Sequence, residues 1–74
     1  MTANAELAAR ARQLADRELR GSRARAAALC CAVALGESAS IAGARKILDA
    51  WDGPAAIRDA AIKALGQLAS QESP

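Results

Sequence analysis

Two adjacent cysteines, Cys30 and Cys31, are the residues of this sequence best suited to covalent or metal chemistry. A catalytic thiolate needs a base or a cation beside it, and a zinc site needs four ligands. The chain contains no His, and the run 26–36 around the cysteines is uncharged. We therefore expect no metal site, no cofactor and no enzymatic activity.

The compartment follows from the same cysteines and from the absence of targeting patterns. Adjacent side chains on a helix point about 100° apart, which disfavours a mutual disulfide and predicts free thiols in a reducing compartment. Residues 1–6 lack a basic start followed by an apolar stretch, so no secretory signal is expected. The uncharged run 26–36 is shorter than the roughly 20 residues of a membrane span. These features predict a cytoplasmic protein without a membrane partner.

The N-terminal third of the chain is basic, with six Arg against three acidic residues in residues 1–25. Arg10, Arg17 and Arg20 are expected near one helical face, with Arg12 and Arg23 beside it, and such a patch could bind an anionic partner such as DNA or RNA. The other interpretation is a solvated face, partly neutralised by neighbouring acids. We favour the solvated face, because no aromatic residue is interleaved for base stacking.

Trp51 is the single aromatic residue and therefore the best candidate for a partner-binding anchor or a core anchor. Arg45 and Lys46 precede it on the same expected helix and are tentative partner-binding residues. Residues 28–51 can also be read as a helix-turn-helix in which these two cations face DNA. This interpretation requires a dimer, and the helix that would serve as the recognition helix has few Asn, Gln and Arg residues.

The composition and the placement of helix-breaking residues predict an all-α fold. The chain has 74 residues, of which 22 are Ala, and Gly and Ser divide it into four helices. We expect helices at about 4–20, 23–36 and 54–70, and a third helix that begins after Ser38 or Ser40 and runs to about residue 51. They form one domain over residues 1–74 with frayed ends at about 1–3 and 71–74. Asn4 and Ser22 are expected N-caps, and Gly36 an expected C-terminal glycine. The apolar stripe of the first helix is predicted to comprise Leu7, Ala8, Ala11, Leu14, Ala15 and Leu19.

The second helix is apolar on all sides from residue 26 to residue 35. A helix of this kind is surrounded on most sides, so it is expected at the centre of the domain or covered by a second subunit. A chain this short is marginal as a monomer, which predicts a homo-oligomer, most simply a homodimer.

Ala34-Leu35-Gly36 recurs as Ala64-Leu65-Gly66, 30 residues later, and each triplet lies near the end of a helix that follows another helix. The segment 57–68, from Ile57-Arg58 to Ala64-Leu65-Gly66-Gln67-Leu68, resembles the second helix of a HEAT-like repeat. The resemblance covers about residues 34–69; residues 4–33 depart from the pattern, with Ala27-Ala28 in place of a β-branched residue and Arg. It implies four short helices as two stacked hairpins, with another four-helix bundle as the alternative. Gly66 is expected where another backbone comes close.

These observations favour a non-enzymatic protein–protein interaction module that presents a helical surface to a macromolecular partner. The alternative is a small DNA- or RNA-binding regulator that uses the N-terminal Arg cluster or the helix-turn-helix. Salt dependence separates the two, because binding to nucleic acid weakens steeply with added salt.

Overall fold

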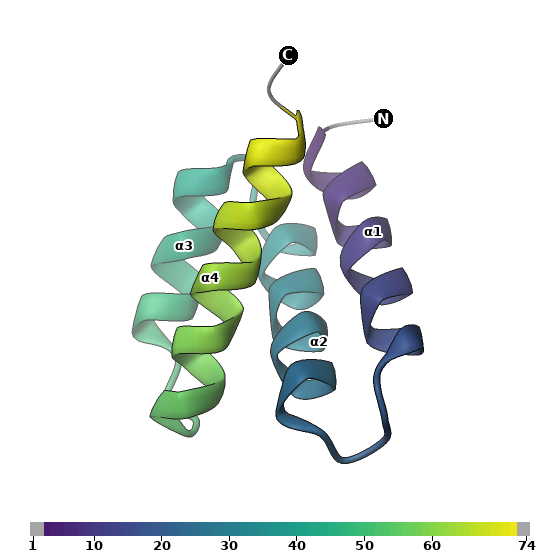
Figure 1. Ribbon diagram of the computed structural model, residues 1–74. Helices are drawn as coiled ribbons and strands as arrows, with labels where there is room; N and C mark the ends of the chain where they lie inside the picture. The colour runs from purple at the N-terminus through teal and green to yellow at the C-terminus, as the bar shows by residue number, and fades with distance from the viewer. Residues whose placement is uncertain (1–2, 73–74) are drawn as a thin grey trace.

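The computed structural model describes residues 3–72, and within them it contains four helices and no strand. The helices are α1 (Ala3–Arg17), α2 (Arg23–Gly36), α3 (Ile41–Ala50) and α4 (Ala55–Glu72). Successive helices run in opposite directions, so the chain forms two hairpins, α1–α2 and α3–α4, which pack together (Figure 1). The predicted all-α fold is confirmed. Of the ends predicted to fray, residues 1, 2, 73 and 74 lie outside the described residues.

Helix α2 is the centre of the fold, as its apolar sequence predicts, because it packs against α1, α3 and α4. Figure 1 shows α1 on one side of α2 and α3 on the other. The core is built largely from Ala and Leu, and the small Ala side chains let the helices approach one another closely. The buried core consists of Leu7, Ala8, Ala11, Ala27, Cys31, Ala32, Ala34, Leu35, Ala44, Leu48, Ala61, Leu65 and Leu68.

Two serines set the N-termini of α2 and α3. The Ser22 hydroxyl accepts a hydrogen bond from the Arg25 backbone N–H at 3.1 Å, and the Ser40 hydroxyl accepts one from Gly43 N–H at 3.0 Å. Each side chain thereby satisfies one of the backbone donors that a helix leaves free at its N-terminus. The predicted cap at Ser22 is confirmed.

The first helix is shorter than predicted. It ends at Arg17, and the chain turns through residues 18–22, where Gly21 adopts a φ of +79° that side chains other than glycine disfavour. Leu19 therefore lies beyond the helix and is 81% exposed, and Leu14 is 39% exposed at the edge of the packed face. Both were expected in the apolar stripe, and both expectations are wrong.

Asn4 is not an N-cap, because it lies inside α1 with its side chain buried. Its Nδ2 atom donates to the Ser38 carbonyl at 2.9 Å and reaches the Ser38 hydroxyl at 3.2 Å. The Ser38 hydroxyl in turn donates to the Ala34 carbonyl at 2.9 Å. This chain of hydrogen bonds ties the start of α1 to the loop between α2 and α3.

Two glycines behave differently from their sequence interpretation. Gly36 is the last residue of α2 rather than the residue after it, and the cap at Glu37 donates its N–H to the Val33 carbonyl at 3.1 Å. Gly66 lies on the exposed side of α4, and a side chain added there would meet no atom within 4 Å. The expected close approach of another backbone at Gly66 is therefore wrong.

Candidate functional site

An apolar groove runs between α2 and α3 and encloses about 240 Å³. Ile47 and Trp51 come from α3 and the residue that caps it, and they lie on the same side of that helix as the buried Leu48. Spacings of three and four residues place them there. The groove is lined by Leu29, Cys30, Val33, Ala34, Ile47, Leu48 and Trp51, none of which is charged.

The groove continues onto the outer face of α2. Ala26, Leu29, Cys30 and Val33 recur at helical spacing, and no other helix covers this face completely. Leu29 is 41% exposed and Val33 is 56% exposed, and both are large apolar residues of α2. We call this surface, made by Leu29, Cys30, Val33, Ile47 and Trp51, the α2–α3 face.

The buried sides of α2 carry four alanines, Cys31 and Leu35, which face the neighbouring helices. Two further large apolar side chains, Leu29 and Val33, face outward. The arrangement leaves apolar surface that contact with another molecule would remove from water.

Trp51 is held in place by the turn that follows α3. It caps the helix, with its backbone N–H donating to the Leu48 carbonyl at 3.1 Å, and its backbone is extended. The indole ring lies directly against the backbone of Gly53, where an added Cβ would collide with the ring. Gly53 thus sets the ring position at the edge of the groove. The glycine follows Trp51 by two residues, so the contact is local in the sequence.

The thiols of Cys30 and Cys31 are free, as predicted. Cys31 is fully buried, and burial, with a smaller repulsive contribution from Cys30, raises its pKa to about 11. Burial also raises the pKa of Cys30. Both thiols are therefore mostly protonated near neutral pH, and the fully buried Cys31 is the less reactive of the two. Across residues 3–72, no three side chains of the His, Cys, Asp and Glu types come together in a way that could hold a metal ion.

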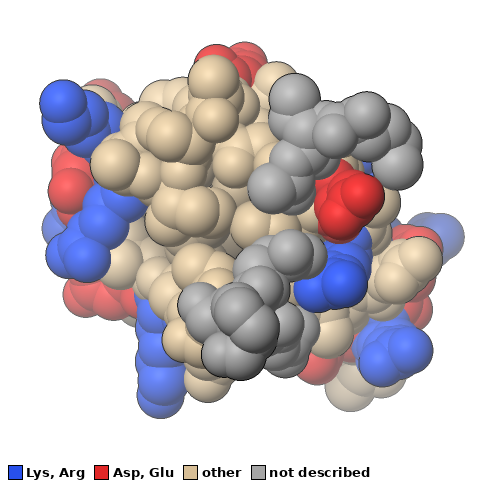
Figure 2. Space-filling view, turned by 90° about the horizontal axis from the view of Figure 1, so that it is seen from above, with Lys and Arg blue, Asp and Glu red and all other residues tan. Residues whose placement is uncertain are grey.

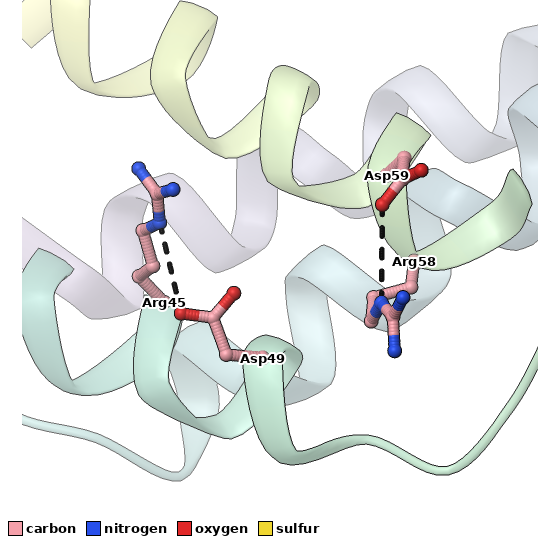
Figure 3. A network of polar contacts seen from close by, with 4 residues as sticks. All are labelled: Arg45, Asp49, Arg58 and Asp59. Atoms are coloured by element: carbon pink, nitrogen blue, oxygen red, sulfur yellow. Dashed lines mark ion pairs between the residues drawn. The ribbon is translucent and has the colours of Figure 1, made fainter. Parts of the chain in front are cut away.

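Arg45 and Trp51 do not lie together. Arg45 lines a polar depression between α3 and α4, and its Nε atom lies 3.8 Å from an Asp49 carboxylate oxygen. A second pair, Arg58 and Asp59, is 3.8 Å apart in the same depression (Figure 3). Lys46 is exposed and lines neither this depression nor the apolar groove. Ion pairs of this length near the surface contribute little to stability, and Lys63 adds a further positive charge to the depression.

The N-terminal arginines are exposed but are spread over two places. Arg10 and Arg17 lie on α1 beside a shallow depression, whereas Arg20 and Arg23 lie in the loop and at the first residue of α2. Arg20 is not on the helical face predicted for it, because α1 ends before it. Arg25 has a structural role, since its Nη1 atom donates to the Ala15 carbonyl at 2.8 Å near the end of α1. Figure 2 shows much of one end of the molecule as uncharged surface, with most of the visible Lys and Arg side chains toward its rim.

The arrangement of α2 and α3 gives no support to a helix-turn-helix over residues 28–51. The two helices lie side by side and run in opposite directions (Figure 1), whereas the helices of that motif cross at about 90–120°. Arg45, one of the two proposed reading residues, is placed beside Asp49.

The described residues form four packed helices with an apolar groove between α2 and α3. Comparisons with protein-family models, with curated proteins and with solved structures found no match. None of the helices in residues 3–72 has the length and apolar character needed to cross a membrane.

Proposed function

We propose that this chain is a non-enzymatic protein–protein interaction module whose contact surface is the α2–α3 face. The observation that carries the proposal is the outward position of Leu29 and Val33 on a helix whose buried sides are mostly Ala. Fully burying one side chain of this kind contributes about 1.5–3 kcal/mol. Contact with a partner would recover the part of this energy that folding leaves unused.

Trp51 supports the same surface. A large aromatic ring at the edge of an apolar groove is a frequent anchor of protein interfaces. Because the ring rests on Gly53, its position is set before a partner arrives, which reduces the entropy lost on binding. The α2–α3 face therefore combines exposed aliphatic side chains with one ordered aromatic ring.

The HEAT-like resemblance is part of this proposal. It implies hairpins that stack through their helices and bind other proteins, and the packing of α2 against α4, the second helices of the two hairpins, supports it. The free thiols of Cys30 and Cys31 support a reducing compartment such as the cytoplasm. The nucleic-acid alternative has less support, because its arginines lie in two places without an aromatic residue beside them.

The test compares two equivalent substitutions of exposed apolar residues. Val33→Glu places a charge on the α2–α3 face, and Leu19→Glu places one in the loop between α1 and α2. Tagged wild-type chain and the Leu19→Glu variant should capture the same proteins from the native cell, and Val33→Glu should capture none of them. Equal capture by all three chains, with helical content unchanged by circular dichroism, would refute the α2–α3 face as the contact surface.

A further inference from the structure

The charges at the two ends of α2 oppose its own helix dipole. The helix begins with Arg23, has no acidic residue in its first turn and no basic residue in its last turn, and is capped by Glu37. A cation at the N-terminus and an anion at the C-terminus are each unfavourable for the helix that carries them. Within the described part of the chain, no hydrogen bond or ion pair engages the side chain of Arg23 or of Glu37.

These two charges lie on the same side of α2 as its exposed apolar residues. Arg23, Ala26, Cys30, Val33 and Glu37 follow one another at spacings of three and four residues, so they form a single stripe along the helix. The two charged residues of the stripe are equally far from Cys30 in the sequence: Arg23 precedes it and Glu37 follows it by the same number of residues. Each charge is about 10 Å from Cys30 along the helix axis.

We propose that the partner of the α2–α3 face is a second copy of this chain, joined through antiparallel packing of the two α2 helices about a two-fold axis near Cys30. This inference rests on the proposed function, because it assigns the occupant of the same face. In such a pair, Arg23 of one copy lies toward Glu37 of the other, and the same contact repeats on the opposite side of the axis. A symmetric interface requires this self-complementarity.

Antiparallel packing also reverses the unfavourable dipole interactions. The C-terminus of the partner helix then lies beside Arg23, and its N-terminus lies beside Glu37, so each charge meets the helix end that stabilises it. A partner of unrelated sequence would have to supply both an anion and a cation at matching distances. A second copy supplies them through the same two residues, beside the same apolar residues Leu29 and Val33.

Charge reversal tests the arrangement directly. Arg23→Glu and Glu37→Arg each place a charge that suits the α2 dipole, so neither should weaken the helix itself. Each single variant should nevertheless raise the dimer dissociation constant about tenfold, since two exposed pairs per dimer change from attraction to repulsion. The double variant Arg23→Glu/Glu37→Arg should return to within about threefold of wild type. Arg12→Glu, the same change on an exposed position of α1, is the matched control and should leave the constant unchanged.

The dissociation constants come from sedimentation of the 7.6 kDa chain between about 1 and 300 micromolar. A monomer throughout this range would overturn the inference, and so would a double variant that associates no better than the single variants. If the chain is monomeric but Val33→Glu still abolishes capture of another protein, the inference fails and the proposed function stands. If Val33→Glu changes neither self-association nor capture, both fail.

The two cysteines provide an independent test of the register. Cys30 is partly exposed and lies at the proposed axis, whereas Cys31 is fully buried in the core. A short bismaleimide should join wild-type chains into a covalent dimer through their two Cys30 thiols. Cys31→Ala should cross-link like wild type, and Cys30→Ala should give no product. A product that persists in Cys30→Ala, or no product from the wild-type dimer, would overturn the proposed axis.

Discussion

Replacing Gly53 with Ala is expected to displace the Trp51 ring and destabilise the protein. A Cβ at this position would overlap the Cζ2, Cη2 and Cε2 atoms of the indole. Among the described residues only Gly21 has a positive φ, so Ala should not strain the Gly53 backbone itself. The effect therefore isolates the contact between the ring and the turn that holds it at the edge of the groove.

The magnitude follows from two opposing effects. Inserting a methyl group into a packed site costs about 1–3 kcal/mol, whereas Gly→Ala restricts the unfolded chain and returns about 0.4–1 kcal/mol. A net loss of about 1–2 kcal/mol is expected, which lowers the Tm by about 4–8 °C for each kcal/mol in a domain of this size. Thermal unfolding by circular dichroism measures the loss. Trp51 is the sole aromatic residue, so the fluorescence emission reports the displaced ring alone.

Gly36→Ala and Gly66→Ala are the matched controls. Both glycines lie in helices, and an added side chain meets no atom within 4 Å at either position. Gly66→Ala should gain about 0.5–1 kcal/mol, because Ala is favoured over Gly inside a helix, and Gly36→Ala, at the last residue of α2, should gain less. A Gly53→Ala variant that gains stability like these controls, with its emission spectrum unchanged, would show that the Trp51 ring does not rest on Gly53.

Two further predictions concern buried groups. Asn4→Ala should lose about 1 kcal/mol of unfolding free energy in chemical denaturation, because two hydrogen bonds to Ser38 disappear while helix propensity improves slightly. Gln13→Ala, on the exposed side of α1, should lose none. Burial raises the pKa of the Cys31 thiol from 9.0 to about 11. The resulting contribution to the free energy of unfolding is therefore fully present below pH 9 and is lost as the pH rises toward 11. The loss should approach about 2 kcal/mol and be absent in Cys31→Ala; denaturation midpoints with the same pH dependence in both proteins would contradict it.

The start of α2 was predictable because it is encoded locally. Ser22 accepts a backbone N–H within three residues, so the start of α2 requires no knowledge of the rest of the fold. The apolar side of α3 was predictable for the same reason, since Ala44 and Leu48 recur at helical spacing and are both buried. The length and the type of these elements follow from residues that are neighbours in the sequence.

The features that sequence reasoning missed depend on residues that are distant in the sequence. Asn4 looks like a helix cap, but its partner is Ser38, 34 residues away. Arg25 looks like part of a basic cluster, but its guanidinium caps the end of α1 at Ala15. In both cases a polar side chain can bond either to groups near it in the sequence or to groups far from it. Only the packing of the hairpins decides between these partners.

The α2–α3 face shows why a helix without periodicity resists prediction. From residue 26 to residue 35 every side of α2 is apolar, so the sequence cannot indicate which side remains uncovered. The packing decides this: the neighbouring helices cover the sides of α2 that carry Ala32, Ala34 and Leu35, and Leu29 and Val33 remain outside. The charges of Arg23 and Glu37 can then be interpreted as part of the proposed interface, because they flank the uncovered side of the helix. Val33→Ala, which removes apolar area from the uncovered side of α2, should therefore weaken association while leaving the fold intact. A loss of unfolding free energy as large as that from truncating a core residue would contradict this account.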